Sequence, residues 1–69
     1  NMKETIIKVE GMSCQHCVQA VTGALQALPG VAEAKVDLEA GTAAVTYDEN
    51  KVSPEAMKAA ILDQGYDVA

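Results

Sequence analysis

Apolar and polar residues alternate in three stretches of the chain, and this two-residue period predicts β-strands. The stretches are residues 3–9, 31–38 and 43–47, and residues 66–68 can form only a short last strand. A tight turn at residues 39–41 joins the second and third strands as a hairpin. The side chains expected on one face of these strands are Thr5, Ile7, Val9, Ala34, Val36, Leu38, Ala43, Val45 and Tyr47.

Apolar residues at spacings of three and four predict a first helix from Gln15 or His16 to Leu28. Pro29-Gly30 ends this helix, and its inner face carries Val18, Val21, Leu25 and Leu28. Gly23 stands inside it, where glycine costs about 1 kcal/mol relative to alanine. Close approach of another backbone would account for that glycine.

A second helix is predicted to open at residues 53–55, Ser-Pro-Glu. Serine is a good N-cap, proline suits the first helical position, and an acid in the first turn interacts favourably with the helix dipole. Gly65 ends the helix, and its inner face is expected to carry Met57, Ala60, Ile61 and Gln64.

The predicted order is therefore β-α-β-β-α-β, an α+β fold of the ferredoxin-like, split βαβ type. We expect one domain over residues 2–69, with both helices on one face of an antiparallel sheet of strand order 4-1-3-2. This topology brings three connections to one end of the domain: residues 10–15, 39–41 and 64–66.

Composition narrows the function classes. The 69 residues are 49% hydrophobic, which is too apolar for a disordered segment. Five basic and ten acidic residues give a net charge of −5, and two tyrosines are the only aromatics, so neither a basic footprint nor a base-stacking surface for nucleic acid is present. A core of this size leaves little room for an active-site cleft. A binding module is favoured over an enzyme.

Charge is unevenly distributed along the chain. Residues 11–32 contain no Asp, Glu, Lys or Arg, but polar side chains interrupt them, so they predict a helix with an uncharged polar face rather than a membrane span. Four acids are expected to cluster in space at the end of the domain where the three connections meet, and they indicate either ordinary solvation or a docking surface for a basic partner: Glu10, Glu39, Asp63 and Asp67.

Both cysteines lie in residues 11–17, GMSCQHC, at positions 14 and 17. A bridge across so short a loop would constrain the unfolded chain little, so the pair indicates metal binding or redox chemistry in a reducing compartment. The start of a helix favours anions and hence thiolates. Two thiolates suit soft, two-coordinate Cu(I), whereas structural Zn²⁺ requires four ligands.

Three residues around the cysteines have two interpretations each. Met12 is either a thioether ligand or a buried residue that shapes the loop. His16 is expected to be exposed and to point away from a metal held by the cysteines; alternatively it tunes the thiolate charge or binds metal in a dimer. Tyr66 is expected beside the loop, as a packing aromatic or as a neighbour of the metal.

The run of residues 11–17 resembles the GMxCxxC motif of the heavy-metal-associated domain family, and residues 63–68, DQGYDV, are similar to the end of bacterial copper chaperones of the CopZ type. The resemblance covers essentially the whole chain. It implies Cu(I) binding by Cys14 and Cys17, docking with a metal-binding domain of a copper-transporting P-type ATPase, and transfer of the ion. Tyr66 matches the bacterial form, and Ser13, where zinc-exporting relatives often carry Asp, favours Cu(I).

The sequence thus predicts a cytoplasmic Cu(I) chaperone that is not an enzyme and not inserted in a membrane. One alternative is an amino-terminal domain of such an ATPase. A second is a thiol–disulfide oxidoreductase, although the tryptophan that usually precedes its first cysteine is absent from this sequence. We further expect that a second copy can share copper in a copper-dependent homodimer.

Overall fold

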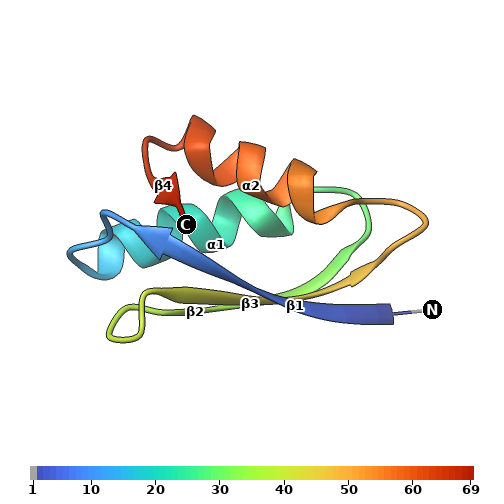
Figure 1. The fold of residues 1–69 in the computed structure, drawn as a ribbon, viewed down its shortest axis with the longest axis horizontal. Coiled ribbons are helices and arrows are strands. Elements are labelled where there is room, and N and C mark those ends of the chain that lie inside the picture. The colour runs from blue at the N-terminus through green and yellow to red at the C-terminus, as the bar shows by residue number, and fades with distance from the viewer. Residues whose placement is uncertain (1) are drawn as a thin grey trace.

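The computed structural model describes residues 2–69, which form a four-stranded antiparallel sheet with two helices on one face (Figure 1). The strand order is β2-β3-β1-β4, so the predicted fold class and strand order are confirmed. The elements are β1 (Met2–Glu10), α1 (Gln15–Gln26), β2 (Val31–Asp37), β3 (Thr42–Asp48), α2 (Pro54–Asp63) and β4 (Asp67–Val68).

The central pair of strands is β1 and β3, in register from Met2 opposite Asp48 to Lys8 opposite Thr42. Side chains on one face of this pair meet the inner sides of both helices, as the alternation predicted. Burying these apolar side chains is the main force that holds the two layers together. The buried core comprises Ile7, Val9, Val21, Leu25, Ala34, Ala43, Val45, Tyr47, Val52, Met57 and Ile61.

The start of α2 has the features that the sequence predicted. Ser53 is the N-cap, and its hydroxyl accepts a hydrogen bond from the Ala56 backbone N–H at 3.3 Å. Pro54 occupies the first helical position and Glu55 lies in the first turn. The cap satisfies one of the N–H groups that a helix start leaves without a partner.

Several element ends differ from the prediction. The first helix ends at Gln26 instead of Leu28, which nevertheless packs against the core. The second strand ends at Asp37, so Leu38 belongs to the turn. Gln64 is exposed at the C-cap of α2, not on its inner face, because the helix stops before it. Element ends depend on turn contacts that periodicity does not contain.

The expectation for Gly23 was wrong. A Cβ added at Gly23 would meet nothing within 4 Å, so no backbone approaches this position. Val52, in the connection between β3 and α2, is buried in the core although no strand or helix was predicted there. Gly30, by contrast, is required: it has φ +97°, and an added Cβ would lie 2.6 Å from the Cβ of Lys51.

Three connections meet at one end of the fold, as the topology predicted: β1 to α1, β2 to β3, and α2 to β4 (Figure 1). The Val9 N–H donates to the Gly41 carbonyl at 2.8 Å and ties the hairpin to β1 there. Neither α1 nor α2, the helices found within residues 2–69, is long and apolar enough to cross a membrane.

Candidate metal-binding site

The two cysteines lie where the loop after β1 enters α1. Cys14 is the N-cap residue of α1, with extended backbone (φ −157°, ψ 173°), and Cys17 lies in the first turn. Their Sγ atoms are 3.6 Å apart. Both thiols are free; Cys14 is exposed and Cys17 is half-buried. The structure therefore brings together the two residues that the sequence predicted as metal ligands. We refer to residues 11–17 as the cysteine loop.

The start of α1 lacks the usual stabilising features. No side chain caps it, and its first turn contains no acid. Backbone N–H groups at a helix start carry partial positive charge when no side chain accepts from them. A thiolate is the anion that this sequence places there, so the local electrostatics favour deprotonated sulfur.

Hydrogen bonds lower the pKa of the Cys17 thiol from 9.0 to about 6. The largest cause is the backbone N–H of Ser13, followed by the Tyr66 hydroxyl and the Cys14 thiol. Each stabilises the charged form more than the neutral one, and partial burial opposes them. A large share of Cys17 is therefore thiolate at neutral pH, which is the form that binds soft metals.

Tyr66 lies against the cysteine loop although about 50 residues separate them in sequence. The interaction of its hydroxyl with the Cys17 thiol is the largest cause that raises the pKa of Tyr66. The ring packs against the core, and a Cβ added at Gly11 would lie 3.6 Å from its Cδ1 atom. The sequence predicted this neighbourhood from topology, but no sequence signal revealed the interaction with Cys17.

The other residues of the cysteine loop take different positions. Met12 is half-buried and packs against the core, and its role as a loop-shaping residue or a thioether ligand stays a prediction. The Ser13 hydroxyl lies 4.0 Å from the Sγ of Cys17. His16 is exposed. Within residues 2–69, no three His, Cys, Asp or Glu side chains are grouped to hold a metal, so His16 is not gathered with the cysteines.

The sulfur positions suit a shared ion with little rearrangement. A disulfide needs about 2.05 Å between sulfurs. A linear S–metal–S unit with bonds of about 2.3 Å needs about 4.6 Å, and a tetrahedral angle needs about 3.8 Å. From 3.6 Å, each is reached by a change of less than about 2 Å, and the tetrahedral separation by only about 0.2 Å, at the exposed Cys14. The distance alone therefore permits metal or disulfide, but a closed tetrahedral zinc site lacks two of its ligands within the described residues.

Sequence comparison gives one family over most of the chain. The model of the heavy-metal-associated domain matches residues 6–67. The protein named "Copper chaperone CopZ" from Staphylococcus haemolyticus is 58% identical over 67 residues, which cover 97% of this chain and 98% of that protein.

Comparison with solved structures gives the same kind of protein as the sequence comparison. A solved structure of a "CopZ metallochaperone" superimposes with a TM-score of 0.96 at 52% identity and covers 97% of this chain and 100% of its own. The amino-terminal domain of a potential copper-translocating P-type ATPase from Bacillus subtilis, solved in its Cu(I)-loaded state, superimposes with a TM-score of 0.94 at 28% identity, over 99% of this chain and 85% of its own.

Proposed function

The chain belongs to the heavy-metal-associated domain family, and on that premise we propose that it is a cytosolic copper chaperone that carries one Cu(I) between the thiolates of Cys14 and Cys17. The residues from 2 to 69 act as one domain of this family. The protein is a carrier rather than an enzyme, and the ion is its cargo.

One observation supports this proposal above the others. Two free thiols lie 3.6 Å apart at an exposed helix start, in a chain 58% identical to a named copper chaperone. Cu(I) is soft and prefers thiolate, and it needs only the two ligands that this site supplies. The low pKa of Cys17 keeps a ligand deprotonated at neutral pH without a strong base.

The same exposure supports transfer by ligand exchange. The incoming thiolate of a receiving domain forms a bond to the copper ion, and the ion's bond to the exposed Cys14 then breaks. A second thiolate of the receiving domain then binds the ion, and the bond to the half-buried Cys17 breaks last. We propose that the receiving domain is the metal-binding domain of a copper-transporting P-type ATPase, since a domain of that class shares this fold at 28% identity.

The test is a competition titration against a chromophoric Cu(I) chelator under anaerobic reduction. Wild-type protein should bind one Cu(I) tightly, whereas Cys14→Ser and Cys17→Ser should each lose tight binding because one of two ligands is gone. His16→Ala serves as the matched control in the same loop and should retain binding. Near-wild-type affinity in both serine variants would overturn the proposal.

An ATPase amino-terminal domain is the second candidate, favoured by the same structural likeness. It uses the same cysteine chemistry, and the higher identity to a chaperone, 58% against 28%, supports the first candidate. Thiol–disulfide exchange is the rival chemistry. Insulin reduction at a rate like that of a dedicated oxidoreductase would establish the rival.

A second copy of this chain can offer the same thiolates as a receiving domain. We therefore propose that copper loading drives association of two copies through their cysteine loops. Sedimentation of metal-free and loaded protein should show a larger mass on loading; an unchanged monomer mass would contradict it.

A further inference from the structure

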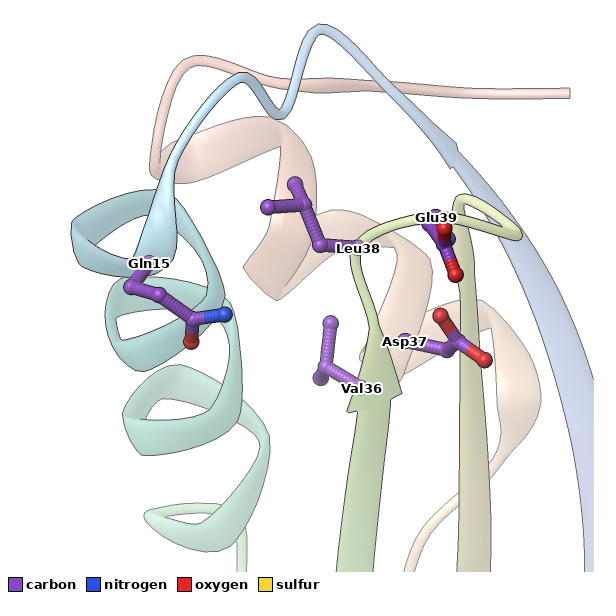
Figure 2. Close-up of a pocket in the computed structure, with 5 residues that line it drawn as sticks. All are labelled: Gln15, Val36, Asp37, Leu38 and Glu39. Atoms are coloured by element: carbon purple, nitrogen blue, oxygen red, sulfur yellow. The ribbon is translucent and has the colours of Figure 1, made fainter.

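A groove of about 460 Å³ opens beside the cysteine loop, between the first turn of α1 and the end of β2. Gln15, the residue after Cys14, forms one side, and residues 36–39 form the other (Figure 2). The side chains of Val36 and Leu38 point toward α1, whereas Asp37 and Glu39 carry their carboxylates on the far side of the strand. The groove thus has an apolar wall and an acidic rim.

Leu38 leaves part of its apolar surface exposed at the groove. It is half-buried, and the partly buried side chains that pack against the core of residues 2–69 include Val36 but not Leu38. Covering such a side chain with a partner removes apolar surface from water, which favours association. An aliphatic side chain of a partner fits this part of the groove.

The two acids of the rim differ in availability. Asp37 accepts a hydrogen bond from the Ala40 N–H at 3.1 Å and holds the hairpin turn. Glu39 is exposed, and the ion pair found within residues 2–69 joins Lys3 to Glu49 instead. The groove lining contains no lysine. Glu39 is therefore free to pair with a cation from outside the chain.

We propose that this groove seats the copper-receiving domain, through an aliphatic side chain against Leu38 and a neighbouring lysine or arginine on Glu39. This inference rests on the proposed function. Two observations select that occupant: the groove's charge calls for a basic partner, and Gln15 directly follows Cys14, so a domain seated here has its own thiolates beside the copper.

The experiment measures the second-order rate of copper transfer from the loaded chain to the amino-terminal domain of the Bacillus subtilis copper-translocating ATPase. Leu38→Asn removes the apolar contact and Glu39→Lys reverses the rim charge. Their matched controls are Ile6→Asn, at a side chain 68% exposed on β1, and Glu33→Lys, an exposed acid on β2. All four variants keep both cysteines.

Both groove variants should slow transfer about 5- to 10-fold, which corresponds to about one order of magnitude in complex affinity. The controls should stay within about twofold of wild type. Copper affinity should be unchanged in all four, because none of the residues is a proposed ligand. Added salt should narrow the gap between Glu39→Lys and wild type, since rim charges are screened.

Four results would overturn the proposal. Leu38→Asn matching Ile6→Asn would show that the groove is not used, while normal copper loading leaves the proposed function intact. Glu39→Lys matching Glu33→Lys would assign the charge effect to overall steering. Self-association of metal-free wild type that Leu38→Asn abolishes would show that a second copy occupies the groove instead. Wild type that loads copper but transfers none would overturn the transfer function and this proposal together.

Discussion

The two helices begin in opposite ways. The start of α2 carries a serine cap bonded at 3.3 Å, a proline at the first position and an acid in the first turn. The start of α1 has no side-chain cap and no acid in its first turn; its cap residue is Cys14. Both helices lie on the same face of the same sheet, but they begin at opposite ends of it (Figure 1).

The difference lies in what satisfies the positive helix end. At α2 it is a neutral hydroxyl that belongs permanently to the fold. At α1 the groups near the positive helix end are the sulfur atoms of Cys14 and Cys17. Their charge depends on pH, and their lone pairs can bind a soft ion. A side-chain N-cap stabilises a helix by about 1 kcal/mol. Helix α1 lacks this stabilisation because its N-cap position is occupied by Cys14, a proposed metal ligand.

Cys14→Ser is the variant expected to have the largest effect on the comparison between the two helix starts. Serine is a strong N-cap but a poor ligand for a soft ion, so Cu(I) affinity should fall by about a thousandfold or more, while metal-free stability should rise by about 0.5–1 kcal/mol. Chelator competition and urea unfolding measure the two effects. Cys17→Ser is the control, because it loses copper without gaining a cap. A Cys14→Ser protein less stable than wild type would break the comparison.

Ser53→Ala tests the other helix start. Loss of the hydroxyl leaves the Ala56 N–H without its acceptor and should lower stability by about 1 kcal/mol, or about 4–8 °C in Tm for a domain of this size. Copper affinity should not change, because α2 begins away from the cysteine loop. Ser53→Thr keeps the hydroxyl and should recover most of the loss. An unchanged Tm in Ser53→Ala would mean that the cap contributes nothing.

Gly23→Ala tests whether another substitution within α1 can also raise the stability of the metal-free protein. Nothing lies within 4 Å of an added Cβ, so alanine should fit and raise stability by about 0.8–1 kcal/mol. Thermal unfolding of the metal-free protein measures this gain, and copper affinity should stay as in wild type. Gly30→Ala, with its positive φ and a 2.6 Å contact, is the opposing control and should destabilise. A loss in both variants would mean that Gly23 has a structural role.

Most of the fold could be predicted because its signals are local. Strand alternation, helical spacing and the Ser53-Pro54-Glu55 start each reside in a few consecutive residues, and the topology follows from their order. The failures have two sources. The burial of Val52, in the connection between β3 and α2, depends on packing against residues distant in sequence. Leu38 leaves its strand because the turn begins at Asp37, whose carboxylate accepts a hydrogen bond from the Ala40 N–H.

The candidate site divides in the same way. Cys14 and Cys17 are three residues apart on a helix start, so their proximity follows from the sequence. The interactions of the Cys17 thiol with Tyr66 and with the Ser13 backbone depend on how the cysteine loop and the α2–β4 connection meet in three dimensions. Periodicity carries no information about that arrangement, so the lowered pKa of Cys17 could be found only in three dimensions.

Tyr66→Phe is expected to have the smallest effect of these variants, and it tests which contacts set the pKa of Cys17. In the folded, metal-free protein this pKa is about 6, below its usual 9.0, because the Ser13 N–H and the Tyr66 hydroxyl donate to the thiolate. The folded state therefore favours the thiolate. Its contribution to stability is complete above pH 9 and is lost as the pH falls through about 6.

Removing the hydroxyl should move the titration midpoint of Cys17 upward from about 6, but only part of the way to 9.0, because the Ser13 N–H, the largest cause, remains. The ¹³Cβ chemical shift of Cys17, followed against pH, reports that midpoint directly. Tyr47→Phe is the matched control: the other tyrosine is buried on β3, and its loss should leave the midpoint in place. A midpoint that stays at 6 in Tyr66→Phe would assign the shift to the start of α1 alone, which would make the contrast between the two helix starts sharper still.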